Sequence, residues 1–249
     1  RYTVNTMHPN TSWVKTSKNA KDQITSYSNY TAFGQPGTII FADDDVEQRL
    51  VTTKPYDALG RLDVVNLPSG QTIDYTHDFC SNANAIAGCT DDKYFSYKKV
   101  EAGGQPTTYE YYDKRGLLTK AATEAFASGY YSVVYFQYDR YGRQIKNSFP
   151  IHQSLDEEKS ESELNWTENF YDLYDRVVKT TTPDGGQVTY LYATLDGGTG
   201  GYVRTVNKKV ADNVSRITTE QYNASGQLMQ VVAPNGAITQ YLYDVDGNL

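Results

Sequence analysis

The chain has few of the residues that enzymes use for nucleophilic catalysis and metal binding. Its 249 residues include 3 histidines and 2 cysteines, and no second His or Cys stands at metal-ligand spacing from His8 or His152. No Gly-x-Ser-x-Gly elbow, His-Glu-x-x-His helix or Gly-Lys phosphate loop occurs. We therefore expect a protein that is not an enzyme, with no catalytic residue, no metal ion and no cofactor.

Long apolar runs and positive charge are also scarce. No window approaches 18 consecutive apolar residues, so the sequence predicts no membrane-spanning helix. The net charge of −7 disfavours nucleic acid as the main partner, because phosphate binding needs a cationic face. The chain starts at Arg1 without an initiator Met or a signal peptide and ends at Leu249 within a turn pattern, so we expect a piece cut from a longer protein.

Among the aromatic residues, Phe and Trp are rare and Tyr is abundant, with 23 Tyr against 8 Phe and 2 Trp. Tyr combines an apolar ring with a polar tip, so it suits a half-wet surface or lumen better than a dry core. No helical periodicity competes with the alternation in segments such as Val188, Tyr190 and Tyr192, which share one strand face. The sequence therefore predicts an all-β fold.

A unit that begins with Tyr-Asp recurs along the chain. In the clearest copy, Gly60 stands four residues after Tyr56, Pro68 stands twelve residues after it, and His77 starts the next unit twenty-one residues after it. We call the first residue of each unit its mark, and we interpret His77 as a substituted tyrosine rather than a catalytic group. The nine marks are Tyr30, Tyr56, His77, Tyr112, Tyr138, Tyr171, Tyr192, Tyr222 and Tyr243, of which His77 and Tyr192 are degenerate.

Each part of the unit has a local physical role. The mark ends a strand, the Asp or Asn that follows can bond to the backbone of a turn, and a Gly with positive φ closes a short hairpin with a bulge. Arg61, Arg143 and Arg176 follow the turn, where they could pair with nearby Asp residues across hairpins or simply keep the face soluble. The turn residues that we expect to hold this structure are Tyr56, Asp57, Gly60, Arg61, Tyr112, Asp113, Gly116, Tyr138, Asp139, Gly142, Arg143, Tyr171, Asp172, Arg176, Tyr222, Gly226, Tyr243, Asp244 and Gly247.

Stacked units of this kind predict consecutive antiparallel β-hairpins in one curved or spiralling sheet, the arc of a hollow shell. Tyrosines would then form ladders across strands, at about 0.2–1 kcal/mol for each pair. Residues 1–23 lack the frame and are expected to form degenerate leading strands, whereas residues 24–249 hold the repeats. The insertions at 78–93, 152–165 and 195–201 should protrude from the sheet.

The two cysteines lie in the first of these insertions. Cys80 and Cys89 could form a local disulfide, which would imply an oxidising compartment. They could equally remain two unpaired thiols in a protein made in the cytosol. The sequence leaves both states open.

The segment Tyr56–Leu62, with the pattern Tyr-Asp-x-x-Gly-Arg-Leu, resembles the YD-repeat signature of Rhs proteins and of the large shell component of bacterial toxin complexes. Residues 138–143 match that signature closely too. The resemblance implies a strip of hairpins that spirals into a hollow shell around a toxic C-terminal domain. Its implied partners are the remaining repeats of the same parent chain, that enclosed domain, and other toxin-complex or secretion-system components, for a bacterial protein that is secreted or lies at the cell surface.

Two other functions stay open beside this structural one. Exposed aromatic ladders can stack on sugars, so the chain could be a cell-surface carbohydrate-binding repeat module. A β-sandwich or β-helix hydrolase would need paired carboxylates outside the repeat positions, and the sequence shows no such pair. We therefore expect a non-catalytic segment of a toxin-encapsulating shell.

Overall fold

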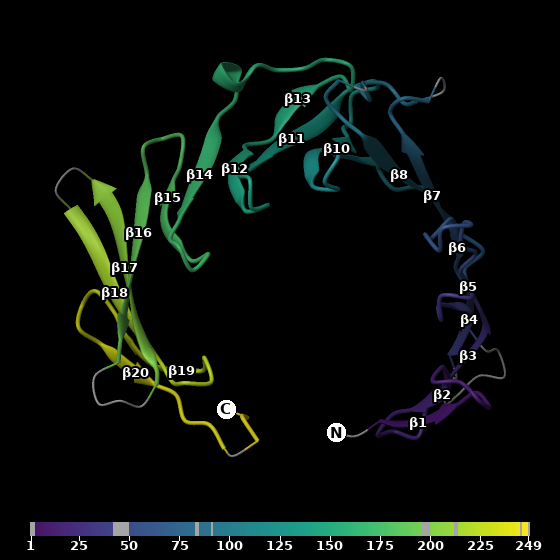
Figure 1. Ribbon diagram of the computed structural model, residues 1–249, viewed down its shortest axis with the longest axis horizontal. Helices are drawn as coiled ribbons and strands as arrows, with labels where there is room; N and C mark the ends of the chain where they lie inside the picture. Colours follow the sequence, from purple (N-terminus) through teal and green to yellow (C-terminus); the bar gives the residue numbers. More distant parts are fainter. Residues whose placement is uncertain are drawn as a thin grey trace. The chain divides into compact units, whose positions relative to one another are not determined.

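The computed structural model describes residues 3–41, 50–82, 85–90, 92–195, 200–211, 214–244 and 246–248. These residues form a succession of antiparallel strands, which Figure 1 shows with their labels. They divide into two compact units. Unit 1 consists of Arg1–Val133 with Ile151–Glu158, and unit 2 consists of Val134–Pro150 with Lys159–Leu249.

In unit 1, each strand from β1 to β10 pairs antiparallel with the next strand along the chain. The first residues of β11 (Tyr131–Tyr138) pair with β13 (Ile151–Gln153). The other strands of unit 1 are β1 (Val4–Met7), β2 (Val14–Lys18), β3 (Ile24–Tyr30), β4 (Pro36–Phe41), β5 (Leu50–Thr53), β6 (Val64–Asn66), β7 (Thr72–Phe79), β8 (Ser96–Ala102), β9 (Thr108–Tyr112) and β10 (Leu118–Glu124).

In unit 2, the last residues of β11 pair with β12, β12 pairs with β14, and each strand from β14 to β20 pairs antiparallel with the next. A 3₁₀ turn, η1 (Glu161–Glu163), precedes β14. The strands are β12 (Gln144–Ser148), β14 (Trp166–Tyr171), β15 (Val177–Thr181), β16 (Gln187–Thr194), β17 (Tyr202–Ala211), β18 (Val214–Tyr222), β19 (Leu228–Val232) and β20 (Ile238–Gln240).

The predicted all-β class and its consecutive antiparallel hairpins are therefore confirmed. Strands such as β15 and β19 are half-buried along their whole length, so both of their faces are partly accessible to solvent. Thr, Val and Tyr suit such strands because they combine β propensity with tolerance of water. Within the described ranges, no helix is long and apolar enough to cross a membrane.

Most of the buried side chains belong to unit 1. Among the buried apolar residues of the described ranges, only Tyr135 and Leu164 lie in unit 2. Tyr111 and Val133 are fully buried, and so is the side chain of Lys120. Unit 1 therefore has a small core, whereas unit 2 consists mainly of half-buried strands.

The core of unit 1 lies beneath two of the insertions. We call residues 79–95 and 151–158 together the cap. Cys80 is bonded to Cys89, and both are buried. A Cβ added to Gly88 would stand 1.9 Å from the carbonyl oxygen of Leu155, so the two parts of the cap are in close contact.

The cap corrects the expectation that the insertions at 78–93 and 152–165 simply protrude. The hydroxyl of Tyr111 on β9 donates to the carbonyl of Ala87, 3.0 Å away, and Leu155 is buried. The sequence pattern could not reveal these contacts because they join segments far apart in the chain. Residues 83, 84 and 91 of the first insertion, and 196–199 of the third, lie outside the described residues.

Candidate functional site: the joints between repeats

The same turn follows seven of the nine marks, whereas the degenerate marks His77 and Tyr192 lie within β7 and β16. At Asp57, the backbone N–H donates to the carbonyl of Arg61 at 2.8 Å, and the N–H of Gly60 donates to the carbonyl of Asp57 at 2.9 Å. Gly60 has φ +76°, which a residue with a Cβ adopts only at a cost. This is a type I turn closed by a bulge, the geometry of a three-residue hairpin loop.

The side chain after the mark holds the turn from inside. Oδ1 of Asp57 accepts hydrogen bonds from the N–H of Leu59 at 2.9 Å and from the N–H of Arg61 at 2.8 Å. The same pair of bonds, to the second and fourth residues onward, is made by Asp113, Asp139, Asp172, Asn223 and Asp244. The fourth residue after the mark has positive φ at Gly116, Gly142, Asp175, Gly226 and Gly247. The sequence frame therefore corresponds to one repeated local geometry.

The arginine that follows the turn pairs with this carboxylate. Nε of Arg61, Arg143 and Arg176 donates to Oδ2 of the Asp four residues earlier, at 2.7, 2.7 and 2.8 Å. In the Tyr112 unit, Leu117 occupies this position, and Arg115 makes the bond instead, at 2.9 Å. The sequence left open a pairing with Asp across hairpins, but these bonds lie within each arginine's own turn, and Arg143 also reaches Asp175 of the next unit.

In several units the mark forms a bond to the preceding unit. The hydroxyls of Tyr171, Tyr192 and Tyr243 donate to the backbone carbonyls of Gln144, Val177 and Leu228, at 2.8, 3.1 and 3.0 Å. Each acceptor lies six residues after the preceding mark. We call this contact a joint. The same offset gives a longer contact of 3.4 Å from Tyr56 to Pro36, and a contact of 3.2 Å between Nε2 of His77 and the carbonyl of Leu62.

The same kind of contact reaches into residues 1–23, where the sequence predicts degenerate leading strands. Tyr30 donates to the carbonyl of Val14 at 2.5 Å. Val14 is paired across its hairpin with Met7, as the other joint acceptors are paired with their preceding marks. The N–H of His8 donates to the carbonyl of Trp13 within the turn that follows Met7. Met7 therefore holds the place of a mark, in a turn one residue longer than the others.

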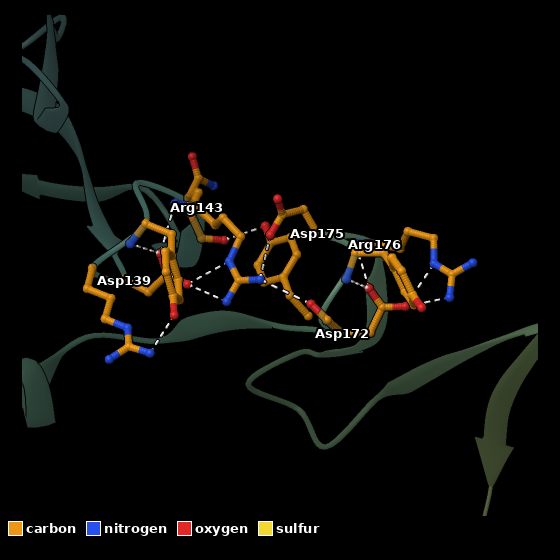
Figure 2. Close-up of polar contacts among 10 residues, drawn as sticks. Asp139, Arg143, Asp172, Asp175 and Arg176 are labelled. Atoms are coloured by element: carbon orange, nitrogen blue, oxygen red, sulfur yellow. Dashed lines mark hydrogen bonds and ion pairs between the residues drawn. The ribbon is translucent and has the colours of Figure 1, made fainter.

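The arginine after the turn makes a second link to the next unit, which Figure 2 shows for Arg143. Its guanidinium is bound to Asp139 in its own turn, and its Nη1 donates to Oδ1 of Asp175 at 2.8 Å and to the carbonyl of Asp172 at 3.2 Å. The hydrogen bond to Asp139 is the main reason why the pKa of Arg143 is raised. The guanidinium carbon also lies 4.9 Å from the ring centre of Tyr171. The joint thus combines a hydroxyl–carbonyl bond with a cation over the ring.

The predicted tyrosine ladders across neighbouring strands occur in part. The ring centre of Tyr202 on β17 lies 6.4 Å from that of Tyr192 on β16 and 4.7 Å from that of Tyr222 on β18. In the described part of the chain, no ring pair joins two marks directly. The guanidinium of Arg176 also lies 4.3 Å from the ring centre of Tyr192. At the joints, arginine is therefore a ring partner that the sequence did not predict.

Two marks bond to a carboxylate instead of a carbonyl. The hydroxyl of Tyr222 donates to Glu220 at 2.9 Å, and Nη2 of Arg204 lies 2.6 Å from the same oxygen. Burial, followed by the bond to Glu220, raises the pKa of Tyr222 to about 12. Tyr112 donates to Glu110 at 2.7 Å in the same way, and Lys98 supplies the cation at 3.0 Å. Both tyrosines stay protonated at neutral pH, as hydrogen-bond donors must.

The remaining histidine is also beside an aromatic ring. His152 stacks flat on Tyr130, with ring centres 4.9 Å apart and an interplanar angle of 3°. No group of three His, Cys, Asp or Glu side chains within the described ranges could hold a metal ion. The contact that recurs in both units is the joint, and the joints are the candidate site.

Comparisons with known proteins agree with this geometry. A family model described as RHS Repeat matches residues 222–249. The crystal structure of TcdB2-TccC3 is similar to 93% of this chain at 15% identity with a TM-score of 0.51, and that of TcdB2-TccC3 without its hypervariable C-terminal region is similar to 93% at 15% identity with a TM-score of 0.55. No curated protein sequence matches the chain.

The likeness to these structures concerns the fold, since the identity is low. The chain spans 15% and 18% of the length of the two chains that it resembles. Residues 222–249 include the Tyr222 and Tyr243 turns described above, so the matched repeat has the same geometry as the earlier units. The resemblance of this chain to YD-repeat proteins of the Rhs type is therefore confirmed, and residues 222–249 are an Rhs repeat.

Proposed function

We propose that this chain is a segment of the wall of a toxin-encapsulating shell built from YD repeats, and that it has no catalytic activity. The remaining repeats of the parent protein complete the wall, and its C-terminal toxin domain is the enclosed partner. The similar crystal structures contain TcdB2-TccC3, and one of them is described as lacking a hypervariable C-terminal region.

The observation that carries the proposal is the joint and its constant offset. In Tyr171, Tyr192 and Tyr243, the hydroxyl of one unit is bonded to the backbone of the unit before it. The side chains of the repeat frame are therefore used to connect neighbours. A strip held in this way can be extended by adding units, which is what a wall around a large volume requires.

The turn carboxylates support a function without catalysis. Asp57, Asp139 and Asp172 each accept bonds from two backbone N–H groups and an arginine. Burial alone would raise the pKa of each carboxyl, but these bonds outweigh it, and each pKa lies below its ordinary value. Such groups are ionised near neutral pH and cannot act there as general acids.

The rings at the joints favour a wall over a sugar-binding surface. Stacking on a sugar requires an open ring face, and the guanidinium groups of Arg143 and Arg176 cover one face of Tyr171 and Tyr192. In the proposed function the parent protein is exported from a bacterium and is secreted or lies at the cell surface. The Cys80–Cys89 bond suits an oxidising compartment. Other toxin-complex or secretion-system components are further partners of the parent protein.

The test uses the complete natural polypeptide in which this chain occurs. Limited proteolysis combined with electron microscopy should show a hollow particle and a C-terminal domain that resists cleavage. The triple substitution Tyr171→Phe, Tyr192→Phe and Tyr243→Phe should make that domain cleavable, whereas Tyr174→Phe at an exposed turn should not. A solid particle, or a C-terminal domain cleaved at once in the natural protein, would rule out the proposed function.

A further inference from the structure

The joint at His77 differs from the tyrosine joints in the group that makes the bond. Nε2 of His77 lies 3.2 Å from the carbonyl oxygen of Leu62, six residues after the mark Tyr56. A tyrosine hydroxyl would make the equivalent bond, as it does elsewhere in the strip. Imidazole is the side chain whose charge changes between about pH 5 and 8, whereas a tyrosine hydroxyl stays neutral there. One joint of the repeat therefore contains a titratable group.

The charged groups that face His77 are already paired with one another. Asp57 and Arg61 belong to the preceding turn and are bonded to each other at 2.7 Å. Lys98 on β8 is the register partner of His77, and it is paired with Glu110 on β9 at 3.0 Å. A proton added to His77 would therefore place a third positive charge beside two cations, while both nearby carboxylates are engaged.

The electrostatic balance agrees with this geometry. Burial first, and then the charge of Arg61, lower the pKa of His77 below its ordinary value of 6.5. Lys98 lowers it further, whereas the Leu62 carbonyl and Asp57 act in the opposite direction without cancelling the effect. Since the folded-state pKa is lower than the unfolded one, the joint has its full stability above about pH 6.5. It loses stability as the pH falls from there toward the folded-state pKa.

Unit 2 contains a matched joint that lacks the titratable group. Tyr192 donates to the carbonyl of Val177 at 3.1 Å, and it follows its preceding mark by the same twenty-one residues. Arg176 lies over its ring, and its register partner Arg204 is paired with Glu220. The two joints thus have basic residues at the same two positions, after the preceding turn and at the register partner, and differ in the side chain at the mark.

We propose that the His77 joint is an acid-sensitive connection between neighbouring units, closed at neutral pH and loosened in mildly acidic solution, while the tyrosine joints do not respond. One consequence rests on the proposed function: if the chain is part of a wall, that wall would first open at the His77 joint. The acid response itself is a property of the joint.

The experiment is amide hydrogen exchange measured by mass spectrometry on the whole chain at about pH 7.5 and about pH 5, corrected for intrinsic exchange rates. Between the two conditions, protection of Val64–Asn66 and Thr72–Phe79 should fall severalfold more than protection of Val177–Thr181 and Gln187–Thr194. His77→Tyr should remove this difference. Tyr192→His should create the same acid response in β15 and β16, because Arg176 and Arg204 surround the new imidazole.

Equal responses of the two joints in the natural chain would overturn the inference, and so would an acid response that survives in His77→Tyr. Near-ultraviolet circular dichroism at neutral pH establishes whether each variant is folded. If a variant is not folded, the comparison of the two joints within the natural chain alone tests the inference. This experiment and the test of the proposed function can give different results. If the chain shows the acid response but its parent protein forms no hollow particle, the inference about the His77 joint holds and the proposed function is wrong.

Discussion

The stretch from Tyr56 to Tyr112 in unit 1 and the stretch from Tyr171 to Tyr222 in unit 2 have the same joint face and different opposite faces. Both begin with two marks twenty-one residues apart and end with a mark bonded to a glutamate. On the opposite face of unit 1, Tyr111 is fully buried beneath the cap. The equivalent residue of unit 2 is Gln221, which is half-buried.

This difference shows which features the repeat needs. The turn, the joint and the tyrosine–glutamate–cation group occur in unit 2 with little buried apolar core. The cap adds a core to unit 1 on the other face, where Tyr97 and Tyr109 are also buried. The frame residues therefore determine the joint face, and the opposite face is free to vary between units.

The polar centre of the cap provides the largest expected effect. Nζ of Lys120 donates to Glu158 at 2.7 Å and to the carbonyl of Leu155 at 2.8 Å, and Tyr94 also donates to Glu158. Burial lowers the pKa of Lys120, and the charge of Glu158 opposes that shift. Glu158→Ala should destabilise unit 1 by about 3–5 kcal/mol, because it leaves a buried ammonium without its carboxylate.

The measurement is denaturant unfolding followed by amide exchange in β9 and β10, with β16 to β18 as the internal reference. Glu220→Ala is the matched substitution in unit 2, and it should cost only about 1 kcal/mol because the side chain of Arg204 is a third exposed. Equal losses of unfolding free energy for Glu158→Ala and Glu220→Ala would contradict the account, because the ion pair beneath the cap would then contribute no more than the partly exposed pair in unit 2.

Opening the disulfide should give the second largest effect. The double substitution Cys80→Ser and Cys89→Ser should cost unit 1 about 2–4 kcal/mol, since the bond restricts the unfolded loop. Unit 2 contains neither of the chain's two cysteines, so its exchange should not change. A comparison of the natural chain with and without reductant checks the result, and a loss of protection in β16 would contradict the independence of the two units.

The turns should respond equally in the two units. Gly116 has φ +77° and Gly226 has φ +78°, and neither has another group within 4 Å of the place where a Cβ would stand. Gly116→Ala and Gly226→Ala should each cost about 1–2 kcal/mol, because only the left-handed conformation opposes the methyl group. Thermal unfolding of the two variants measures this cost. Clearly different losses of stability for the two variants would show that the turn in unit 1 also depends on its contacts outside the turn.

The sequence was sufficient for the features that are local. The Tyr-Asp-x-x-Gly pattern specifies a turn whose hydrogen bonds all lie within five residues, as at Asp57 and Gly60. The all-β class followed from the same pattern. The sequence left open a pairing of Arg61 with an Asp across hairpins, whereas the structure pairs it with Asp57 of its own turn. The geometry of the turn decides the direction of this side chain, and the sequence pattern alone does not give it.

The features that sequence reasoning missed depend on distance along the chain or on backbone acceptors. The joint acceptor at the sixth position is a carbonyl, and residues as different as Gln144, Val177 and Leu228 supply it. The contact between Tyr94 and Glu158 spans 64 residues and has no periodic signal. Neither contact leaves a pattern in the sequence.

The smallest expected effect tests the central claim most directly. Tyr171→Phe, Tyr192→Phe and Tyr243→Phe each remove a joint hydroxyl and keep the ring, and each should cost about 0.5–1.5 kcal/mol in denaturant unfolding. Tyr174→Phe is the control, because Tyr174 is 79% exposed at a turn and should lose nothing measurable. Similar losses at the three marks and none at Tyr174 are the predicted result. Losses at the marks no larger than at Tyr174 would contradict the account, because the hydroxyls would then not hold neighbouring units together.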